Sequence, residues 1–320
     1  QALQEIVARH EVLRSGFITV AGEPRQIVFE QQDFRLAQYD LSALDEVAQQ
    51  AQLMLLRQAE QRRGFDLTAG GLLRASLIWC GTEQAVLLVS MHHIIADGWS
   101  VEVLYKEFGQ LYQALSRGER ITLPALPIQY RDYALWQLSE SQRMKTAAQL
   151  DYWVDALANH IDTFRLPTDR ARAAKVTGAT SRVTFEVTQP LYLELKTATQ
   201  RHGITLNMML SSAWALLLGK LSSNEIMQIG LPVAGREHPA CFELIGLFVN
   251  TIVLKIDLTA DLSLTELFAQ VKSRSIAAYA NQDAPLEQVI ERLNPPRRFN
   301  QHPLFQTLLA LHLPFDDAVI

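Results

Sequence analysis

The most constraining feature of this chain is an apolar run that ends in two adjacent histidines. Residues 85–91 are almost all apolar, His92 and His93 follow them, and Asp97 comes four residues after the second histidine. Apolar residues then recur at helical spacing over 101–115. We therefore expect a strand that ends in a tight polar turn and leads directly into an amphipathic helix. Such a junction is a common way of holding a catalytic side chain rigidly.

Composition excludes several classes of protein. The 320 residues are 48% hydrophobic and 20% charged, which is typical of a globular protein with a sizeable core. The net charge of -5 argues against the basic face that a nucleic-acid binder needs. No run approaches the roughly 20 apolar residues of a membrane span, and no signal-peptide pattern is present. Cys80 and Cys241 lie far apart, which indicates a reducing compartment without a disulfide framework.

The alternation of strands and helices predicts an α/β protein with two lobes, each a sheet covered by helices. Helices are expected at 1–15, 43–63, 101–115, 130–136, 142–157, 190–202, 206–221, 264–279 and 285–293. Strands are expected at 17–20, 26–29, 72–79, 85–91, 182–187, 226–233, 249–257 and 306–313. Weak periodicity at 159–180 predicts a linker between an N-terminal lobe, 1–165, and a C-terminal lobe, 175–320.

The two histidines are not expected to be equivalent. Neighbouring residues at a strand end point to opposite faces, so one of the pair must point into the structure. We assign His92 to the scaffold and His93 to the chemistry, because a histidine with an ordinary pKa of about 6.5 can accept or donate a proton near neutral pH. A metal site is the rival, but neither His-Glu-x-x-His nor paired Cys-x-x-Cys occurs, so no metal is predicted.

Other catalytic signatures are absent from the sequence. It contains no Gly-x-Ser-x-Gly nucleophile elbow, phosphate loop or dinucleotide fingerprint. Covalent catalysis therefore has no evident nucleophile, which leaves a histidine that assists the attack of one bound substrate on another. Asp97 could cap the following helix, or it could form a buried ion pair with an arginine that keeps the turn in shape. Gly98 is expected to allow a conformation or a close approach that a Cβ would forbid.

Six sequence blocks together resemble the condensation domains of nonribosomal peptide synthetases. Residues 92–98 are similar to the family signature His-His-x-x-x-Asp-Gly, and the further blocks, in the family's order, lie at 9–17, 130–137, 245–251, 281–287 and 303–306. Ser15, Leu286 and His302 stand where the family usually has Thr, Phe and Asn. The family extends beyond the first and last of these blocks, so we expect a fragment that is trimmed at both ends.

The resemblance implies a V-shaped pseudo-dimer of two chloramphenicol-acetyltransferase-like lobes, with the His-His turn midway along a tunnel. Donor and acceptor groups would enter from opposite faces on the phosphopantetheine arms of upstream and downstream carrier domains. The domain itself would bind no cofactor. It would adjoin an adenylation domain in a cytoplasmic multidomain synthetase of bacterial type, with no nucleic-acid or membrane partner. The residues expected at the tunnel or the lobe interface are Trp99, Ser100, Tyr133, Asn250 and Gln282.

The alternative for these residues is packing. A large side chain such as Tyr133 belongs more often to a core than to a ligand site. Asn250 and Gln282 would satisfy backbone groups that cross between the lobes.

The activity implied by the resemblance is an amide-forming acyl transfer, in which an acceptor amine attacks a donor thioester. We predict that His93 orients the amine and handles its proton, and that the backbone N–H of Gly98 stabilises the oxyanion. Asp97 is expected to pair with Arg236, or with Arg14 as second choice. The rivals are epimerisation of a carrier-bound residue and a non-catalytic module that docks carrier domains. Trp99 and Ser100, which follow the turn, and the block at 283–287 favour condensation over epimerisation.

Overall fold

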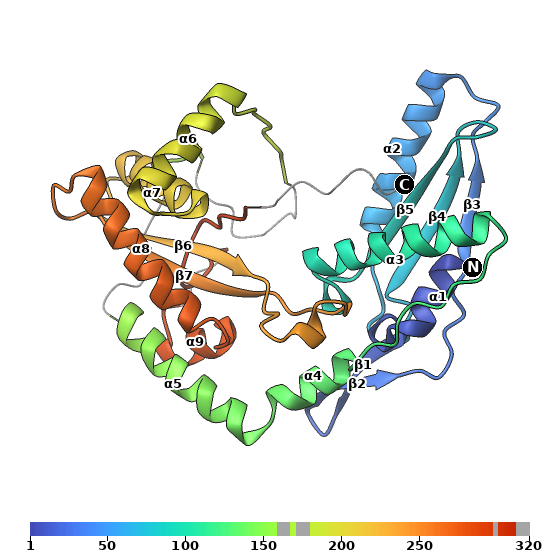
Figure 1. The fold of residues 1–320 in the computed structure, drawn as a ribbon, viewed down its shortest axis with the longest axis horizontal. Coiled ribbons are helices and arrows are strands. Elements are labelled where there is room, and N and C mark those ends of the chain that lie inside the picture. Colours follow the sequence, from blue (N-terminus) through green and yellow to red (C-terminus); the bar gives the residue numbers. More distant parts are fainter. Residues whose placement is uncertain (159–166, 171–179, 297–299, 312–320) are drawn as a thin grey trace. The chain divides into compact units, whose positions relative to one another are not determined.

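A computed structural model describes residues 1–158, 167–170, 180–296 and 300–311 (Figure 1). Among these residues, the chain divides into two compact units. The first contains residues 1–139 together with 236–248. The second contains the described residues of 140–235 and 249–311.

The first unit is built around a mixed sheet. β3 (Leu36–Asp40) pairs in parallel with β4 (Leu73–Trp79), which pairs antiparallel with β5 (Ala85–Met91). The remaining elements are α1 (Ala2–Arg9), a 3₁₀ turn (Glu11–Arg14), the hairpin β1 (Ser15–Val20) and β2 (Glu23–Val28), α2 (Glu46–Arg62), α3 (Gly98–Ser116) and α4 (Tyr130–Gln137).

The core of the first unit joins α1 and α3 to the sheet. α1 contacts α3, and both contribute apolar side chains to one buried cluster with β4. Ile6 of α1, Leu72 immediately before β4 and Ile95 after β5 are all fully buried. Burying side chains of this size stabilises each by roughly 1.5–3 kcal/mol relative to exposure. The β5–turn–α3 junction is therefore anchored in the core on both sides.

The second unit is organised around two long antiparallel strands. β6 (Ile226–Val233) pairs with β7 (Asn250–Asp257), and nearly every residue of β6 is buried. The helices are α5 (Glu140–Leu157), α6 (Gln189–His202), α7 (Leu206–Ser222), α8 (Leu264–Ala280) and α9 (Leu286–Leu293). α7 contacts β6, and α8 and α9 contact β7, which explains why both strands are apolar on both faces (Figure 1).

Two predicted strands of the second unit differ in the structure. Residues 182–187 alternate as predicted but form no strand, and the side chains of Val183 and Phe185 are 86% and 82% exposed. A period of two makes a strand only where a neighbouring strand pairs with it, and no described segment does so here. The predicted strand 306–313 is reduced to one parallel bridge between Gly230 and Leu308, and its last two residues lie outside the described residues.

The first unit also differs in detail from the sequence prediction. The opening helix ends at Arg9, where the predicted one ran to residue 15, because His10 adopts an extended conformation. Gly16, which follows the predicted helix and would have ended it, lies in β1. β3 was not predicted from the sequence, because its five residues carry no clear alternation. The other predicted helices and strands are present with boundaries shifted by a few residues.

The two units are not continuous in the sequence. The predicted linker at 159–180 lies mostly outside the described residues and stays a prediction. Two segments fall in the unit opposite to the one expected: α5 belongs to the second unit, and residues 236–248 belong to the first. α5 packs there through Trp153, which is 3% exposed and donates its indole N–H to Asn281 O at 2.8 Å.

None of the described helices is by itself long and apolar enough to cross a membrane. α6 and α7 taken together reach that length and composition, but they bend by 101° at the break between them.

Candidate active site at the His-His turn

His92 closes the end of the sheet. Its backbone N–H donates to Leu72 O at 2.9 Å, one step beyond the last ladder pair of β4 and β5. Its Nδ1 accepts the backbone N–H of Ile94 at 3.0 Å, which caps the 3₁₀ turn formed by 93–95. The imidazole also meets Phe65 edge-on, with ring centroids 5.8 Å apart. His92 therefore has the contacts of a scaffold residue.

His93 is presented to solvent by the same turn. Its side chain is exposed, and none of the described residues makes a hydrogen bond or an ion pair with its ring. Ile95 and Ala96, two and three residues further on, are 0% and 6% exposed, so the turn that carries the imidazole is anchored in the core. A histidine held rigidly with its ring nitrogens available can bind or move a proton on a substrate.

Asp97 is the buried centre of the turn. Its Oδ1 accepts the Ser100 N–H at 2.8 Å and so caps α3, and its Oδ2 accepts the Phe248 N–H at 2.9 Å. Arg236 Nη2 lies 3.1 Å from Oδ1, and the Arg236 and Asp97 side chains are 1% and 3% exposed. Cap and ion pair were alternatives from the sequence, whereas the structure shows that the carboxylate serves both.

Arg236 carries the buried positive charge. Its Nη1 donates to Cys241 O at 2.5 Å and to Leu244 O at 2.7 Å, and the guanidinium lies 3.9 Å from the Phe248 ring centroid. Burial lowers the pKa of Arg236, and the neighbouring Asp97 opposes that shift. The predicted pairing of Asp97 with Arg236 is therefore confirmed.

The second choice, Arg14, was wrong. Arg14 donates to Phe29 O at 2.5 Å and lies 3.7 Å from the carboxylate of Glu11. These partners hold the start of β1 rather than the turn, because Arg14 extends from the 3₁₀ turn beside the first hairpin.

Ser100 and Trp99 fasten the segment 236–248 to the start of α3. The Ser100 hydroxyl accepts the Gly246 N–H at 3.0 Å and lies 2.8 Å from Gly246 O. The Trp99 indole N–H donates to Phe242 O at 2.9 Å. Ser100 is 0% exposed, so its side chain lines no opening, contrary to the prediction; Trp99 is 39% exposed.

Gly98 differs from the expectation drawn for it. A Cβ built on this residue would meet nothing within 4 Å, and its backbone φ is not in the left-handed region. The protein's own atoms therefore do not require glycine here. Gly98 opens α3, and its N–H donates no hydrogen bond to the described residues. It belongs to a helix N-terminus, where partial positive charge accumulates.

An aromatic cluster supports the 236–248 segment. The Tyr130 hydroxyl donates to Leu247 O at 2.8 Å, and its ring meets Phe248 edge-on at 5.1 Å. Tyr133 packs against the Phe248 ring with centroids 4.6 Å apart. Burial raises the pKa of Tyr130 to about 12, and the nearby Asp97 adds to the shift. Tyr133 is thus a packing residue in this structure, which was the alternative weighed for it.

Asn250 and Gln282 lie together in the second unit. Asn250 Nδ2 donates to the carbonyls of Gln282 and Ala284, each at 2.7 Å, and its Oδ1 accepts the Leu286 N–H at 3.3 Å. Asn250 therefore satisfies backbone groups, as predicted. However, those groups belong to its own unit, so these hydrogen bonds do not cross between lobes. The reason is that Asn250 begins β7 beside the loop that leads into α9.

Sequence reasoning missed a buried charged cluster formed by Arg9, His10 and Glu107. Arg9 Nε lies 2.8 Å from Glu107 Oε1, and His10 Nε2 lies 3.0 Å from Oε2. Glu107 is 3% exposed on α3. A signal was available, because Glu107 falls on the same helical face as Leu104 and Leu111, where a lone carboxylate requires a partner.

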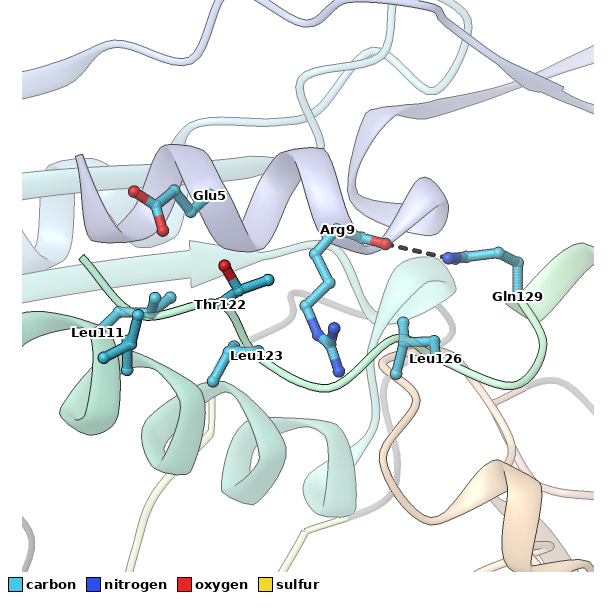
Figure 2. A pocket seen from close by; sticks show the side chains of 8 residues that line it. Glu5, Arg9, Leu111, Thr122, Leu123, Leu126 and Gln129 are labelled. Carbon is cyan, nitrogen blue, oxygen red and sulfur yellow. Dashed lines mark hydrogen bonds between the residues drawn. The ribbon is translucent and has the colours of Figure 1, made fainter.

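A surface hollow of about 350 Å³ lies between α1 and α3, beneath the loop that follows α3 (Figure 2). Its lining residues are Glu5, Arg9, Leu111, Ile121, Thr122, Leu123, Leu126 and Gln129. Gln129 Nε2 donates to the carbonyl of Arg9 at 3.0 Å, which ties the loop to α1. The hollow shares no residue with the His-His turn.

No group of three possible metal ligands occurs among the residues that the structure describes.

The fold and the turn define the class of protein. The chain belongs to the condensation domain family, whose model matches residues 1–318. Its mixed α/β architecture, with sheets covered by helices, is the chloramphenicol-acetyltransferase-like fold of that family.

Named relatives support this membership. The chain is 39% identical over 316 residues to malpinin synthetase of Mortierella alpina, covering 99% of this chain and 4% of the relative. It is 37% identical over 311 residues to one of the linear gramicidin synthase polypeptides of Brevibacillus parabrevis, covering 97% of this chain and 4% of the relative. The chain thus spans only a small part of the synthetases that it matches.

Two solved structures illustrate the shared fold. The X-domain from teicoplanin biosynthesis superposes with a TM-score of 0.84 at 27% identity, covering 96% of this chain and 68% of that one. A four-domain nonribosomal peptide synthetase bound to AMP and glycine superposes with a TM-score of 0.84 at 23% identity, covering 97% and 23%. The second likeness concerns the fold alone.

Proposed function

We propose that this chain forms a peptide bond during nonribosomal peptide synthesis, and that His93 is its catalytic residue. The observation that carries the proposal is the exposed imidazole of His93 on a turn held by the buried Asp97–Arg236 pair. Membership of the condensation domain family supports the reaction class. In the reaction, the amine nitrogen of an acceptor aminoacyl group attacks the thioester carbonyl of a donor. A C–N bond forms, the C–S bond breaks, and the thiol leaves with a proton.

His93 would act mainly by orienting the amine and accepting its proton as the tetrahedral state collapses. A free α-amine has a pKa of about 7.7–8.0, so part of it is already neutral at pH 7 and its first deprotonation is a small barrier. Positioning the amine against the thioester can contribute several kcal/mol by making the step effectively unimolecular. The oxyanion would be stabilised by the N–H of Gly98 at the start of α3. The absence of a Cβ on Gly98 leaves open space beside that N–H.

The substrates would arrive on the phosphopantetheine arms of an upstream donor and a downstream acceptor carrier domain. An adenylation domain would adjoin them in a cytoplasmic synthetase, and this domain would hold no cofactor of its own. The length of the matched synthetases, of which this chain covers 4% in two cases, supports such a setting.

The test is a condensation assay with both carrier domains loaded with defined aminoacyl groups. His93→Ala should lower product formation at least about 100-fold, with an unchanged unfolding temperature, because the side chain is exposed and makes no hydrogen bond or ion pair with the described residues. The matched control is His92→Asn, in which a side-chain oxygen can still accept the Ile94 N–H, and it should retain most activity. Product formation at the wild-type rate by His93→Ala would refute the assignment. Exchange of an α-proton in deuterated water, with one loaded carrier and no acceptor, would instead indicate epimerisation.

A non-catalytic docking module is the second candidate. It is favoured by the likeness to the X-domain of teicoplanin biosynthesis, which has been solved in complex with OxyB; that structure superposes with a TM-score of 0.83 at 26% identity. Under this alternative the chain would bind a partner protein without turnover. Saturable binding of a loaded carrier domain, with no product over many hours, would favour docking over condensation.

A further inference from the structure

The cluster of Arg9, His10 and Glu107 is unusual because it is buried, charged and separate from the residues assigned to the reaction. His10 is 1% exposed and Glu107 is 3% exposed. Burial by itself would raise the pKa of Glu107, but hydrogen bonds from His10 and Arg9 and the charge of the Arg9 guanidinium oppose it, and that pKa is lowered. Glu107 is therefore an ionised carboxylate with a fixed cation, Arg9, on one oxygen and the His10 imidazole on the other.

The two ring nitrogens of His10 have different partners. Nδ1 lies 3.4 Å from the backbone nitrogen of Ile245 in donor geometry, so Nδ1 must accept that N–H. The proton of a neutral imidazole then sits on Nε2 and is donated to Glu107 Oε2 at 3.0 Å. The imidazole thus accepts the Ile245 N–H at one ring nitrogen and donates to Glu107 from the other.

Ile245 connects this cluster to the His-His turn. The next residue, Gly246, places both its N–H and its carbonyl against the Ser100 hydroxyl, at 3.0 and 2.8 Å. The same segment supplies Arg236 to Asp97. The backbone at 245–246 is thus held between the end of α1 and the start of α3, and any shift of it is transmitted directly to Ser100 and Asp97.

We propose that His10 is a positioning residue of the condensation site. Its Nδ1 fixes the backbone of Ile245, and through Gly246 it sets the position of Ser100 and Asp97 beneath the turn that carries His93. Glu107 and Arg9 hold the imidazole in the tautomer that this contact requires. The expected effect of His10 on the reaction rate rests on the proposed function. The hydrogen bond by which His10 fixes the Ile245 backbone does not depend on it.

Two substitutions separate the contacts of His10. In His10→Asn, Oδ1 is as many bonds from the backbone as Nδ1 and can accept the Ile245 N–H, but nothing reaches Glu107. In His10→Gln, Nε2 is as many bonds away as the imidazole Nε2 and can donate to Glu107, but the acceptor for Ile245 is lost. If His10 only stabilised the fold, the activity of each variant would follow its stability. His10→Gln keeps the buried Glu107 carboxylate paired, so it would then be more stable and more active than His10→Asn.

If His10 positions the turn, His10→Asn should instead be more active than His10→Gln. In the full chain, amide hydrogen exchange of the peptide 236–248 should rise about fivefold in His10→Gln, the effect of one lost hydrogen bond, and stay near wild type in His10→Asn. With both carriers loaded and saturating, kcat should fall about tenfold in His10→Gln only, as expected for a displaced catalytic turn. The unfolding temperature should fall further in His10→Asn.

Several outcomes would overturn the proposal. The proposal fails if kcat in the two variants changes in the same order as their unfolding temperature. It also fails if amide exchange of 236–248 is faster in His10→Gln while kcat is unchanged. Selective ¹⁵N-histidine NMR of the wild-type chain tests the tautomer without any substitution, and a proton on Nδ1 of His10 would also refute it. If the wild-type chain makes no product, the proposed function fails, while the exchange order and the tautomer still decide whether His10 holds the segment.

Discussion

Replacement of Asp97 by alanine tests the central packing argument for the turn. The carboxylate accepts the Ser100 N–H, the Phe248 N–H and a guanidinium N–H of Arg236. Alanine removes both acceptor oxygens, and with them all of these hydrogen bonds, at once. It also leaves the Arg236 charge at 1% side-chain exposure without its counter-ion.

The magnitude follows from these contacts. Removing one partner of a buried ion pair costs about 3–5 kcal/mol, because the remaining charge is uncompensated. Loss of a helix N-cap costs about 1 kcal/mol more. These contributions overlap, so we expect Asp97→Ala to lose roughly 4–6 kcal/mol, a large share of the 5–15 kcal/mol by which proteins of this kind are stable. At about 2–4 °C per kcal/mol, the unfolding temperature should fall by roughly 10–20 °C.

Equilibrium denaturation and thermal unfolding are the assays, with two further variants. Asp97→Asn keeps one oxygen, which can still accept the Ser100 N–H but leaves the Phe248 N–H without its acceptor. It should therefore lose less than Asp97→Ala. The double variant Asp97→Ala with Arg236→Met leaves no buried charge of this pair and should recover about 2–3 kcal/mol relative to Asp97→Ala. An Asp97→Ala protein that is as stable as the wild type but inactive would refute the reasoning and indicate a direct catalytic role. Failure of the double variant to recover stability would refute the desolvation argument.

Further predictions concern the surroundings of the turn. Because the raised pKa of Tyr130 stabilises its protonated form in the folded state, that contribution is complete below pH 10 and lost as the pH rises to about 12. Between these values the wild type should lose roughly 2–3 kcal/mol more than Tyr130→Phe in alkaline denaturation; equal losses would contradict the assigned pKa. A Cβ on Gly246 would overlap the Tyr130 ring, so Gly246→Ala should cost about 3 kcal/mol in chemical denaturation. Gly98→Ala, whose Cβ meets nothing within 4 Å, should unfold within about 1 °C of the wild type, and a large loss there would show that the space is not open.

Local pattern accounted for much of the first unit. The apolar run at 85–91 and the helical spacing after it predicted β5, the turn and α3, and all three are present. The family resemblance was confirmed by a match over residues 1–318. The same reasoning failed at 182–187, because alternation is a property of one segment whereas a strand needs a partner. Gly98 was expected to be required by crowding, but the protein leaves open space around it.

What the sequence determined by itself was therefore the chemistry available and its local frame: two histidines after a strand, an aspartate at a helix start, and an arginine able to pair with it. Only the tertiary structure decided which backbone groups from distant parts of the chain form hydrogen bonds with these residues. The segment 236–248 returns to the start of α3, where Asp97 and Ser100 accept its N–H groups, and His10 reaches the same segment from α1. These contacts join residues more than 130 positions apart, and hydrogen bonds act only over about 3 Å, so no local pattern could have specified them.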